Sequence, residues 1–238
     1  MIAALYDIHG NLPALEAVLA EAAGAESIVL GGDLALGPMP RETLDRLIAL
    51  GAPSVRGNCD RLVVDAFDGR PLPARLPAAM RETVAWTARQ LDRAHRDYLA
   101  ALPLTLTATV DGLGEVLFCH ATPRDDEEIF TKLTPAERLR PTLAGVTQRV
   151  VVCGHTHMQF DRTVDGVRVL NAGSVGMPFA PPGAYWLALG TPPGARHART
   201  DYDRERAADA FRQTGYPAVE QFLSPPSEEQ ALAMFENR

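Results

Sequence analysis

The sequence predicts an α/β fold with a parallel core, and two observations support this. The first 60 residues alternate short apolar runs with segments whose apolar residues recur every three or four positions. This alternation is typical of strands followed by helices. The chain has 238 residues, 46% hydrophobic and 22% charged, which allows a sizeable core with the composition of an ordinary globular protein. We expect a single domain over residues 1–238.

Short apolar runs predict strands along most of the chain. They lie at residues 2–6, 27–30, 104–110, 115–119, 149–153, 162–170 and 184–189. The run at 162–170 contains Asp165-Gly166, a pair that readily adopts the positive φ angles of a hairpin turn. We therefore expect two antiparallel strands there.

Helices are expected where apolar residues recur at helical spacing. One starts at Leu12, where Asn11 can cap it. The next carries Leu44, Leu47 and Ile48 on one face. Both lie between predicted strands, as a parallel core requires.

Two further regions differ from this core. Residues 65–78 are rich in proline and glycine and indicate a loop. Two helical segments follow, the second starting near Asp92, and together they predict a helical insertion at about 65–103 over the core. A helical tail is expected at about 203–238, broken at its prolines.

Charge and composition narrow the function classes. With 23 basic and 30 acidic residues the net charge is −7, which disfavours a nuclease and broad binding to nucleic acid or anionic membrane. No apolar run reaches the roughly 18 residues of a membrane span, and the N-terminus does not resemble a signal peptide. Three widely spaced cysteines favour a reducing cytoplasm over a disulfide framework. The sequence leaves open whether the chain forms a homo-oligomer.

Five predicted strands end in candidate metal ligands. The segments are D-I-H at 7–9, G-G-D at 31–33, G-N-C-D at 57–60, C-H at 119–120 and G-H-T-H at 154–157. Because the carboxyl ends of strands gather at one edge of an open α/β sheet, these segments can converge. Four of the six histidines lie in these motifs, while His95 and His197 lie elsewhere and are expected at the surface.

The side-chain types suit two metal ions. The candidate ligands are Asp7, His9, Asp33, Asn58, His120, His155 and His157. Carboxylate, imidazole and amide groups together suit ions such as Mn²⁺, Fe or Zn²⁺, and seven groups fit two ions that share a bridging carboxylate. Each motif alone has an ordinary explanation, such as a helix N-terminal anion for Asp7 or a turn residue for Asn58. For all five motifs to have such ordinary explanations, five independent coincidences would have to occur in one chain. A metal site explains the whole set better.

The ordered series resembles the calcineurin-like metallophosphoesterase family, and G-N-C-D is similar to the third motif of its prokaryotic phosphodiesterase-type members. The resemblance covers most of residues 1 to about 200. It extends to D-I-H-G-N-L-P-A-L-E-A-V-L, G-D-L-A-L-G-P-M-P-R-E-T-L, C-H-A-T-P and N-A-G-S-V-G-M-P. It implies an α/β (α+β) fold, a four-layer α/β/β/α sandwich of two mixed sheets packed face to face with helices outside.

The resemblance also implies a ligand set and a mechanism. One ion would be held by Asp7, His9, Asp33 and His157, and the other by Asp33, Asn58, His120 and His155, with Asp33 bridging. A hydroxide shared by the ions would attack phosphorus in line, while the ions neutralise developing charge. The implied cofactors are two divalent transition-metal ions, Mn²⁺ first and Fe, Zn²⁺ or Ni²⁺ as alternatives.

The expected function is therefore hydrolysis of a small phosphorylated substrate, a phosphodiester first. A protein or small-molecule phosphomonoesterase is the alternative within the enzyme class. A non-catalytic protein-binding scaffold on the same fold is the alternative from another class, and the intact ligand set speaks against it. Asn58 is also a candidate phosphate contact.

One position departs from many relatives, which carry histidine where this chain has Cys59. In those relatives the histidine pairs with the following acidic residue and protonates the leaving group or steadies the phosphate. Cys59 could be a metal ligand, a nucleophile or a bystander. We interpret it as a bystander at the position of a missing general acid, because a thiol is a poor hydrogen-bond donor. Asp60 keeps the acidic position without an imidazole to orient.

Three weaker candidates remain. Arg124 could reach a phosphate oxygen as a planar fork, although a solvated loop arginine is the simpler interpretation. The acidic run at 125–128 is expected to start a solvated helix or to line the substrate entrance. The turn at 173–176 could approach the metals with its backbone or be purely structural.

Overall fold

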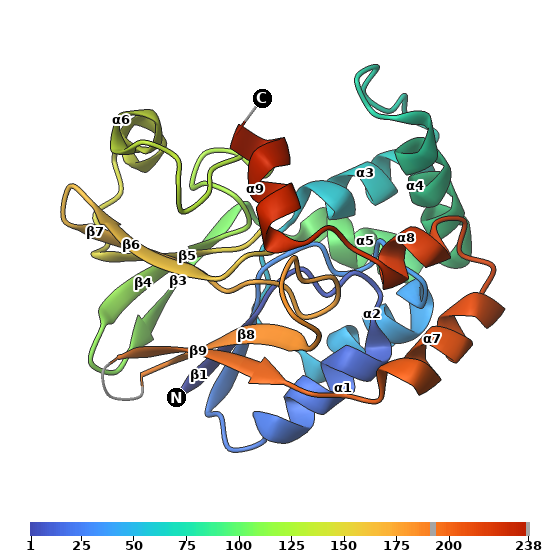
Figure 1. The fold of residues 1–238 in the computed structure, drawn as a ribbon, viewed down its shortest axis with the longest axis horizontal. Coiled ribbons are helices and arrows are strands. Elements are labelled where there is room, and N and C mark those ends of the chain that lie inside the picture. Colours follow the sequence, from blue (N-terminus) through green and yellow to red (C-terminus); the bar gives the residue numbers. More distant parts are fainter. Residues whose placement is uncertain (191–193, 237–238) are drawn as a thin grey trace.

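A computed structural model describes residues 1–190 and 194–236, and two mixed β-sheets form its centre (Figure 1). The first sheet has the order β2-β1-β8-β9 and contains β1 (Ile2–Leu5), β2 (Ser27–Leu30), β8 (Ala184–Leu189) and β9 (Ala195–Thr200). The second has the order β3-β4-β5-β7-β6 and contains β3 (Thr105–Val110), β4 (Gly114–Cys119), β5 (Val150–Cys153), β6 (Phe160–Val164) and β7 (Val167–Asn171). The pairs β1–β2, β4–β5 and β5–β7 are parallel, and the remaining pairs are antiparallel.

The two sheets pack face to face because successive strand residues point to opposite sides. Ile2 and Ala4 of β1 face the second sheet and join a buried cluster with Phe118 of β4. Ala3 and Leu5 point the other way, into a cluster shared with the helices. The short helices α6 (Ala136–Leu139) and η1 (Arg140–Leu143) cover the outer face of the second sheet. The predicted four-layer sandwich is confirmed.

Five helices follow the first strands in a layer outside the first sheet and beside it (Figure 1). They are α1 (Leu12–Glu21), α2 (Pro40–Leu50), α3 (Asn58–Phe67), α4 (Ala78–Gln90) and α5 (Arg93–Ala101). The predicted cap of α1 is confirmed, since the Asn11 side chain accepts the N–H of Ala14 at 3.1 Å. The predicted hairpin is also present, with Asp165 and Gly166 at φ 48° and 86° between β6 and β7.

Three local predictions were wrong or incomplete. Helix α3 begins at Asn58, where the polar stretch had suggested only a strand end, and it runs three residues into the expected loop at 65–78. Strand β9 was not anticipated, because its sequence A-R-H-A-R-T lacks an apolar run. Ile48 is 39% exposed, so the buried face of α2 contains Leu44 and Leu47 without it.

Of the two histidines expected at the surface, His95 is buried and His197 is only partly exposed. His95 is 3% exposed because it braces α5 against α2: its Nε2 lies 2.9 Å from Asp45 and its Nδ1 lies 2.8 Å from Asp92. His197 is half-buried on β9, with its Nε2 3.0 Å from the carbonyl of Asn171.

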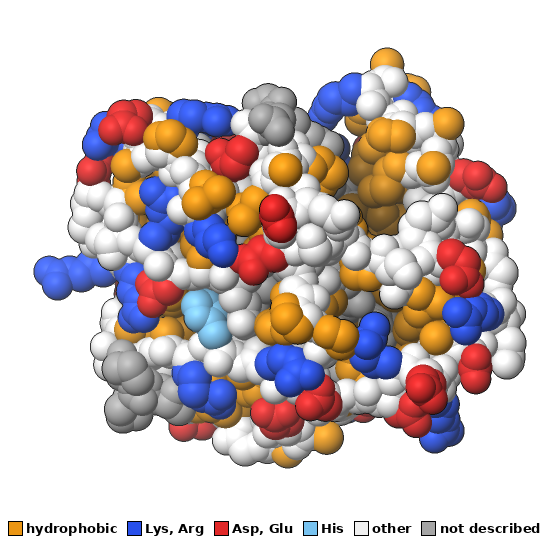
Figure 2. Space-filling model, in the orientation of Figure 1, with side chains coloured by type: hydrophobic (Ala, Val, Ile, Leu, Met, Phe, Trp, Pro, Cys, Tyr) orange, Lys and Arg blue, Asp and Glu red, His pale blue; other side chains and the backbone are white. Residues whose placement is uncertain are grey.

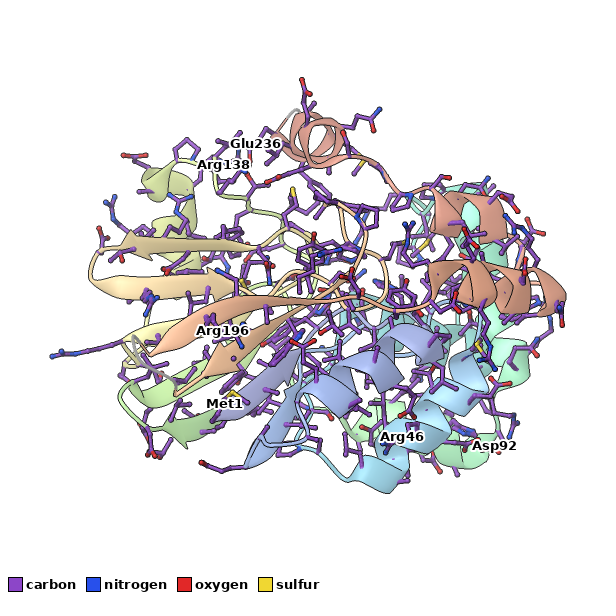
Figure 3. The ribbon with its side chains drawn as sticks, turned by 60° about the horizontal axis from the view of Figure 1, so that its bottom comes forward. Met1, Arg46, Asp92, Arg138, Arg196 and Glu236 are labelled. Carbon is purple, nitrogen blue, oxygen red and sulfur yellow. The ribbon has the colours of Figure 1, made fainter. Side chains whose placement is uncertain are left out.

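The tail forms three short helices, α7 (Arg204–Gln213), α8 (Val219–Leu223) and α9 (Glu228–Glu236), and residues 237–238 of the predicted range lie outside the described part. Glu236 at the end of α9 lies beside the loop that leads to Arg138 (Figure 3). There its carboxylate accepts hydrogen bonds from Thr131 and Thr134. The tail thus returns to the loop between β4 and α6. Within the described ranges, no helix is long and apolar enough to cross a membrane.

Candidate metal centre

The seven predicted ligands converge at the carboxyl ends of β1, β2, β4 and β5 and at the start of α3. Two groups of three residues could each hold a metal ion. They are Asp7, His9 and His157, and Asp33, His120 and His155. Within each group every residue offers one ligand atom, and these atoms lie within 4.8 Å of one another. Asn58 joins the second group, with its Oδ1 3.2 Å from His120 Nε2. Each group contains three members of one of the two ligand sets that the resemblance implied, and their binding of metal stays a prediction.

Backbone strain marks these positions. Asp7, His9, Asp33, His155 and His157 all have positive φ, between 49° and 65°. Residues other than glycine rarely adopt this conformation, which costs about 1 kcal/mol or more at each position and is concentrated at functional sites. The strained loops turn these five side chains inward to a common point.

Three of the histidines are fixed in one tautomer. Their Nδ1 atoms lie 2.7–3.0 Å from backbone carbonyls: His9 from Leu36, His120 from Gly31, and His157 from Met177. A carbonyl can only accept, so Nδ1 carries the hydrogen and Nε2 of the neutral ring presents its lone pair to the centre of the cluster. The Nε2 atoms of His9 and His157 lie 3.1 Å apart, and two facing lone pairs repel unless a proton or a cation lies between them.

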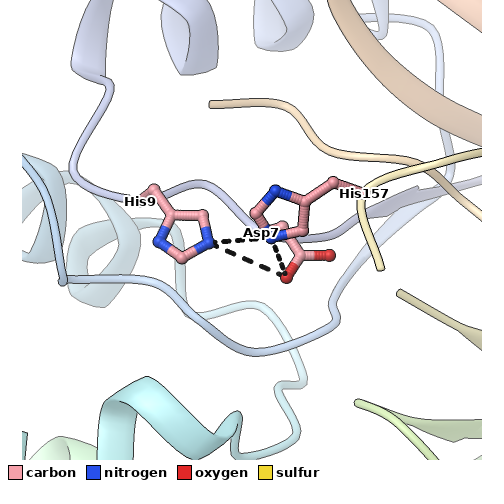
Figure 4. A group of neighbouring side chains, drawn as sticks. All are labelled: Asp7, His9 and His157. Atoms are coloured by element: carbon pink, nitrogen blue, oxygen red, sulfur yellow. Dashed lines mark hydrogen bonds and ion pairs between the residues drawn. The ribbon is translucent and has the colours of Figure 1, made fainter. Parts of the chain in front are cut away.

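The carboxylates point to the same place. Asp7 Oδ1 is buried without a hydrogen-bond partner in the described chain, although His157 Nε2 lies 3.3 Å away and His9 Nε2 3.9 Å away (Figure 4). Asp33 Oδ2 lies between the groups, 3.7 Å from His9 Nε2 and 3.5 Å from His120 Nε2. An orphaned buried carboxylate oxygen facing imidazole lone pairs is a good fit for divalent cations.

Charge is balanced by protons when no cation is present. Burial raises the pKa of Asp33, but His120 and His9 outweigh it and hold that pKa well below its usual range. Burial lowers the pKa of His120, but Asp33 and Asp7 raise it to about 10. Burial and His120 lower the pKa of His155 to about 4. Cations would take the place of the protons on the paired histidines.

Asp60 positions the site from behind, and sequence reasoning missed this role. Its carboxylate is fully buried and accepts the backbone N–H groups of Asp33 (2.8 Å), Leu34 (2.9 Å) and Gly57 (3.0 Å). Asp60 is the third residue of α3, so its bond to Gly57 is half of a capping box. The sequence did contain a signal for this role. An acidic residue stands three positions after Gly57 and just before an apolar pattern with helical spacing, as in a capping box.

At two glycines the backbone lies close to the carboxylates of Asp7 and Asp33. A Cβ on Gly57 would come within 2.1 Å of Asp33 Oδ1, and one on Gly154 within 2.4 Å of Asp7 Oδ2. The turn at 173–176 fits its structural interpretation: Ser174 Oγ donates to the carbonyl of Asp7 at 2.7 Å, and the N–H of Gly176 donates to the same carbonyl at 2.9 Å.

Comparison with known proteins places the chain in a family. Residues 1–190 match the model of the calcineurin-like phosphoesterase superfamily domain. The chain belongs to this superfamily. Its members hydrolyse phosphoric esters, and this chain is such a hydrolase with a metal-binding fold.

Two solved structures and one curated protein are similar to this calcineurin-like phosphoesterase. A metallophosphoesterase from Sphaerobacter thermophilus is 27% identical, with a TM-score of 0.71 over 94% of this chain and 97% of that one. A hypothetical protein from Pyrococcus horikoshii shares the fold at 20% identity, with a TM-score of 0.80 over 93% and 98%. An uncharacterized protein of Methanocaldococcus jannaschii is 29% identical over 178 residues, which are 74% of this chain and 70% of that protein.

In this phosphoesterase, Cys59 lies beside the candidate metal ligands. Its sulfur is grouped with His9 and Asp33 within 4.8 Å, and its backbone N–H donates to Asp33 Oδ1 at 2.8 Å. Burial and the Asp33 carboxylate raise the pKa of the Cys59 thiol well above its usual value. Both carboxylate oxygens of Asp60 already accept hydrogen bonds from backbone N–H groups. Neither oxygen is therefore free to bind the side chain at position 59. Asp60 therefore keeps the acidic position, as the sequence indicated, but its carboxylate supports the backbone.

The weaker candidates lie apart from the cluster. Arg124 is exposed, forms an ion pair with Glu128 and lines a cavity other than the one beside the histidines, so its contact with substrate stays a prediction. The acidic run at 125–128 does not start a helix. Asp126 within it is 4% exposed and binds Arg56 and Arg61 at 3.0 and 2.7 Å, which ties this loop to α3.

A cavity of about 660 Å³ opens beside the cluster, and His9, Asp33, Asn58, His155 and His157 form its floor. A second cavity, of about 740 Å³ and between α7 and the segment 176–183, contains none of the predicted ligands. The first cavity is therefore the candidate substrate site.

Proposed function

We propose that this phosphoesterase is a binuclear metal-dependent enzyme that hydrolyses phosphodiesters. The observation that carries the proposal is the position of Asp33 Oδ2 between the two ligand groups, 3.7 Å from His9 Nε2 and 3.5 Å from His120 Nε2. One ion would be held by Asp7, His9, Asp33 and His157 and the other by Asp33, Asn58, His120 and His155. When bound, the ions would supply Lewis acidity, which makes water nucleophilic near neutral pH and neutralises charge on the phosphoryl group.

The residues of the chain hold and orient the reacting groups. The backbone carbonyls of Leu36, Gly31 and Met177 keep His9, His120 and His157 in the tautomer that can bind a metal. Asn58 stands at the first position of α3, with its side chain lining the cavity, where its amide can also contact a phosphate oxygen.

The site lacks a strong proton donor at position 59. The raised pKa of Cys59 keeps the thiol protonated, but a thiol donates hydrogen bonds weakly. Leaving groups that need protonation should therefore react slowly, which favours diesters with good leaving groups over alkyl monoesters.

Mn²⁺ is the proposed native cation, because mixed carboxylate, imidazole and amide ligands suit it; Fe, Zn²⁺ and Ni²⁺ are the alternatives. The three cysteines are free and buried, which fits a reducing compartment such as the cytoplasm. The substrate would be a small phosphorylated molecule.

The test is a turnover panel. Protein stripped of metal is given Mn²⁺, Ni²⁺, Zn²⁺ or Mg²⁺, and kcat/KM is measured on matched aryl phosphodiesters and phosphomonoesters. We expect highest activity on diesters with Mn²⁺ and about two metal equivalents per chain. One equivalent at full activity would overturn the binuclear assignment, and a monoester preference would overturn the substrate class.

A further inference from the structure

The walls of the substrate cavity come from two segments outside the ligand motifs. One wall is the start of α4 with the residue before it, and includes Pro77, Met80 and Thr83. The opposite wall is the tail from Tyr216 to Pro226. Figure 2 shows the resulting hollow between the tip of α4 and the C-terminal helices, lined by hydrophobic side chains. The tail lies beyond residues 1–190, which the family model matches.

The cavity wall is apolar up to the edge of the metal ligands. The ring of Phe179 stacks on His157 at 4.8 Å between centroids. Tyr216 is 8% exposed and is held edge-on between Trp86 at 5.4 Å and Phe222 at 6.1 Å. These contacts fix the rings, so the wall is a preformed surface for an apolar group.

The cavity offers no compensation for a second negative charge. Among its described lining residues none is lysine or arginine, and the carboxylates are Asp33 in the floor and Glu82, which is exposed on α4. A phosphate bound against this wall would lose water without gaining a cation, at a cost of several kcal/mol. The cations on the floor can balance only the phosphoryl group that reacts.

We propose that this enzyme selects phosphoesters with a single phosphoryl group and an uncharged apolar arm, which the α4 and tail walls enclose, and that it rejects polyphosphates and arms carrying further phosphates. The inference rests on the proposed phosphodiesterase function and specifies its substrate class. Burial of an aryl ring against the wall removes more apolar surface from water than burial of a methyl group, which favours aryl over methyl arms.

The experiment uses diesters that share a p-nitrophenolate leaving group, so that the chemical step stays constant while the arm changes. The arms are methyl, phenyl and naphthyl, together with thymidine attached through its 5′ oxygen, with and without a 3′-phosphate. We expect kcat/KM to rise at least tenfold from methyl to naphthyl, and to fall at least tenfold when the 3′-phosphate is added to thymidine.

Two variants place a cation on the cavity wall. Met80→Lys on α4 and Gln221→Lys on α8, where Gln221 is exposed, should each raise kcat/KM for the 3′-phosphorylated arm at least tenfold relative to the unphosphorylated arm. Ile48→Lys is the matched control, because Ile48 is exposed on α2 and does not line the cavity; its ratio should stay at the wild-type value. Gln221→Lys keeps the test valid if Met80→Lys does not fold.

The outcomes separate this inference from the proposed function. Absence of turnover on every diester with metals bound would overturn the proposed function. Turnover that is equal across arms, or faster with the 3′-phosphate, would overturn the inference and leave the phosphodiesterase function standing. An Ile48→Lys variant that shifts the ratio as much as Met80→Lys would show a general charge effect, and would also overturn it.

Discussion

The carboxylate of Asp60 accepts the backbone N–H of Asp33 at 2.8 Å, so a buried residue on α3 fixes the loop that carries the proposed bridging ligand. The same carboxylate binds the N–H of Gly57 at 3.0 Å, which joins the loops after β2 and before α3. Burial and the Asp33 carboxylate raise the pKa of Asp60 to about 7. The geometry of the candidate metal centre therefore depends on a residue that does not line the candidate substrate cavity.

Asp60→Asn should destabilise the protein and weaken metal binding. The amide NH₂ would face backbone N–H groups and leave a buried donor unsatisfied, which costs about 2 kcal/mol. Thermal unfolding and metal content measure both effects. Asp65→Asn is the matched control on α3, because Asp65 pairs with the half-exposed Arg70 and such pairs contribute less than about 1 kcal/mol. Equal effects of the two variants would contradict the positioning role.

Asp33→Ala should lose at least one of two metal ions and all measurable turnover. Removal of the carboxylate takes a ligand from both groups and leaves His9 and His120 without the charge between them. Elemental analysis with turnover is the measurement. Arg93→Ala is the control, since Arg93 is exposed and paired with Asp97. A variant at position 33 that kept two metal equivalents would refute the bridge.

Chelation should stop turnover without unfolding the chain. The core between the sheets and the cluster shared with the helices consist of apolar residues that need no metal. Circular dichroism before and after removal of the metal should show the same secondary structure, with a lower melting temperature because the bound ions no longer stabilise the native state. Collapse of the spectrum would show that the metal site is structural.

Substitution of Cys59 should change substrate preference more than activity. Cys59→Ala and Cys59→Ser should keep the metal content and most of the activity on an activated aryl diester. Cys59→His should raise the ratio of monoester to diester kcat/KM, because an imidazole is a better proton donor than a thiol. A loss of more than about a hundredfold in Cys59→Ala, or about 2.7 kcal/mol, would show that the thiol acts directly.

The ion pairs of Asp126 should make stability sensitive to acid. Burial raises its pKa, but Arg61 and Arg56 outweigh burial and lower it. The stabilisation is therefore present above the unfolded-state pKa of about 3.9 and is lost as pH falls through the folded value. Arg61→Gln should lower the melting temperature at pH 7 and reduce its fall between pH 5 and pH 3. Arg70→Gln, at an exposed pair, should change neither.

Local patterns in the sequence were enough to predict most strands and the convergence of the ligand motifs. The apolar runs before Asp7, His120 and His155 predicted buried strands, and the carboxyl ends of such strands meet at one edge. Helix α3 was missed because G-N-C-D is compatible with a strand end, and the capping bond from Asp60 to Gly57 that starts the helix depends on three-dimensional geometry. Strand β9 was missed because it is formed by pairing with β8, and its own residues show no apolar alternation.

The sequence by itself determined most strands and the set of candidate ligands, because these depend on residue type and periodicity along short segments. The two mixed sheets were expected only from the resemblance of its motifs to the family. Only the tertiary structure decided which tautomer each histidine adopts, that Asp60 supports the loop of Asp33, and that the tail returns to form a wall of the substrate cavity. These features arise where segments far apart in the chain meet. From the sequence alone, the apolar residues near Tyr216 were equally compatible with a place in the hydrophobic core. Their position beside the candidate metal ligands became known only from the structure.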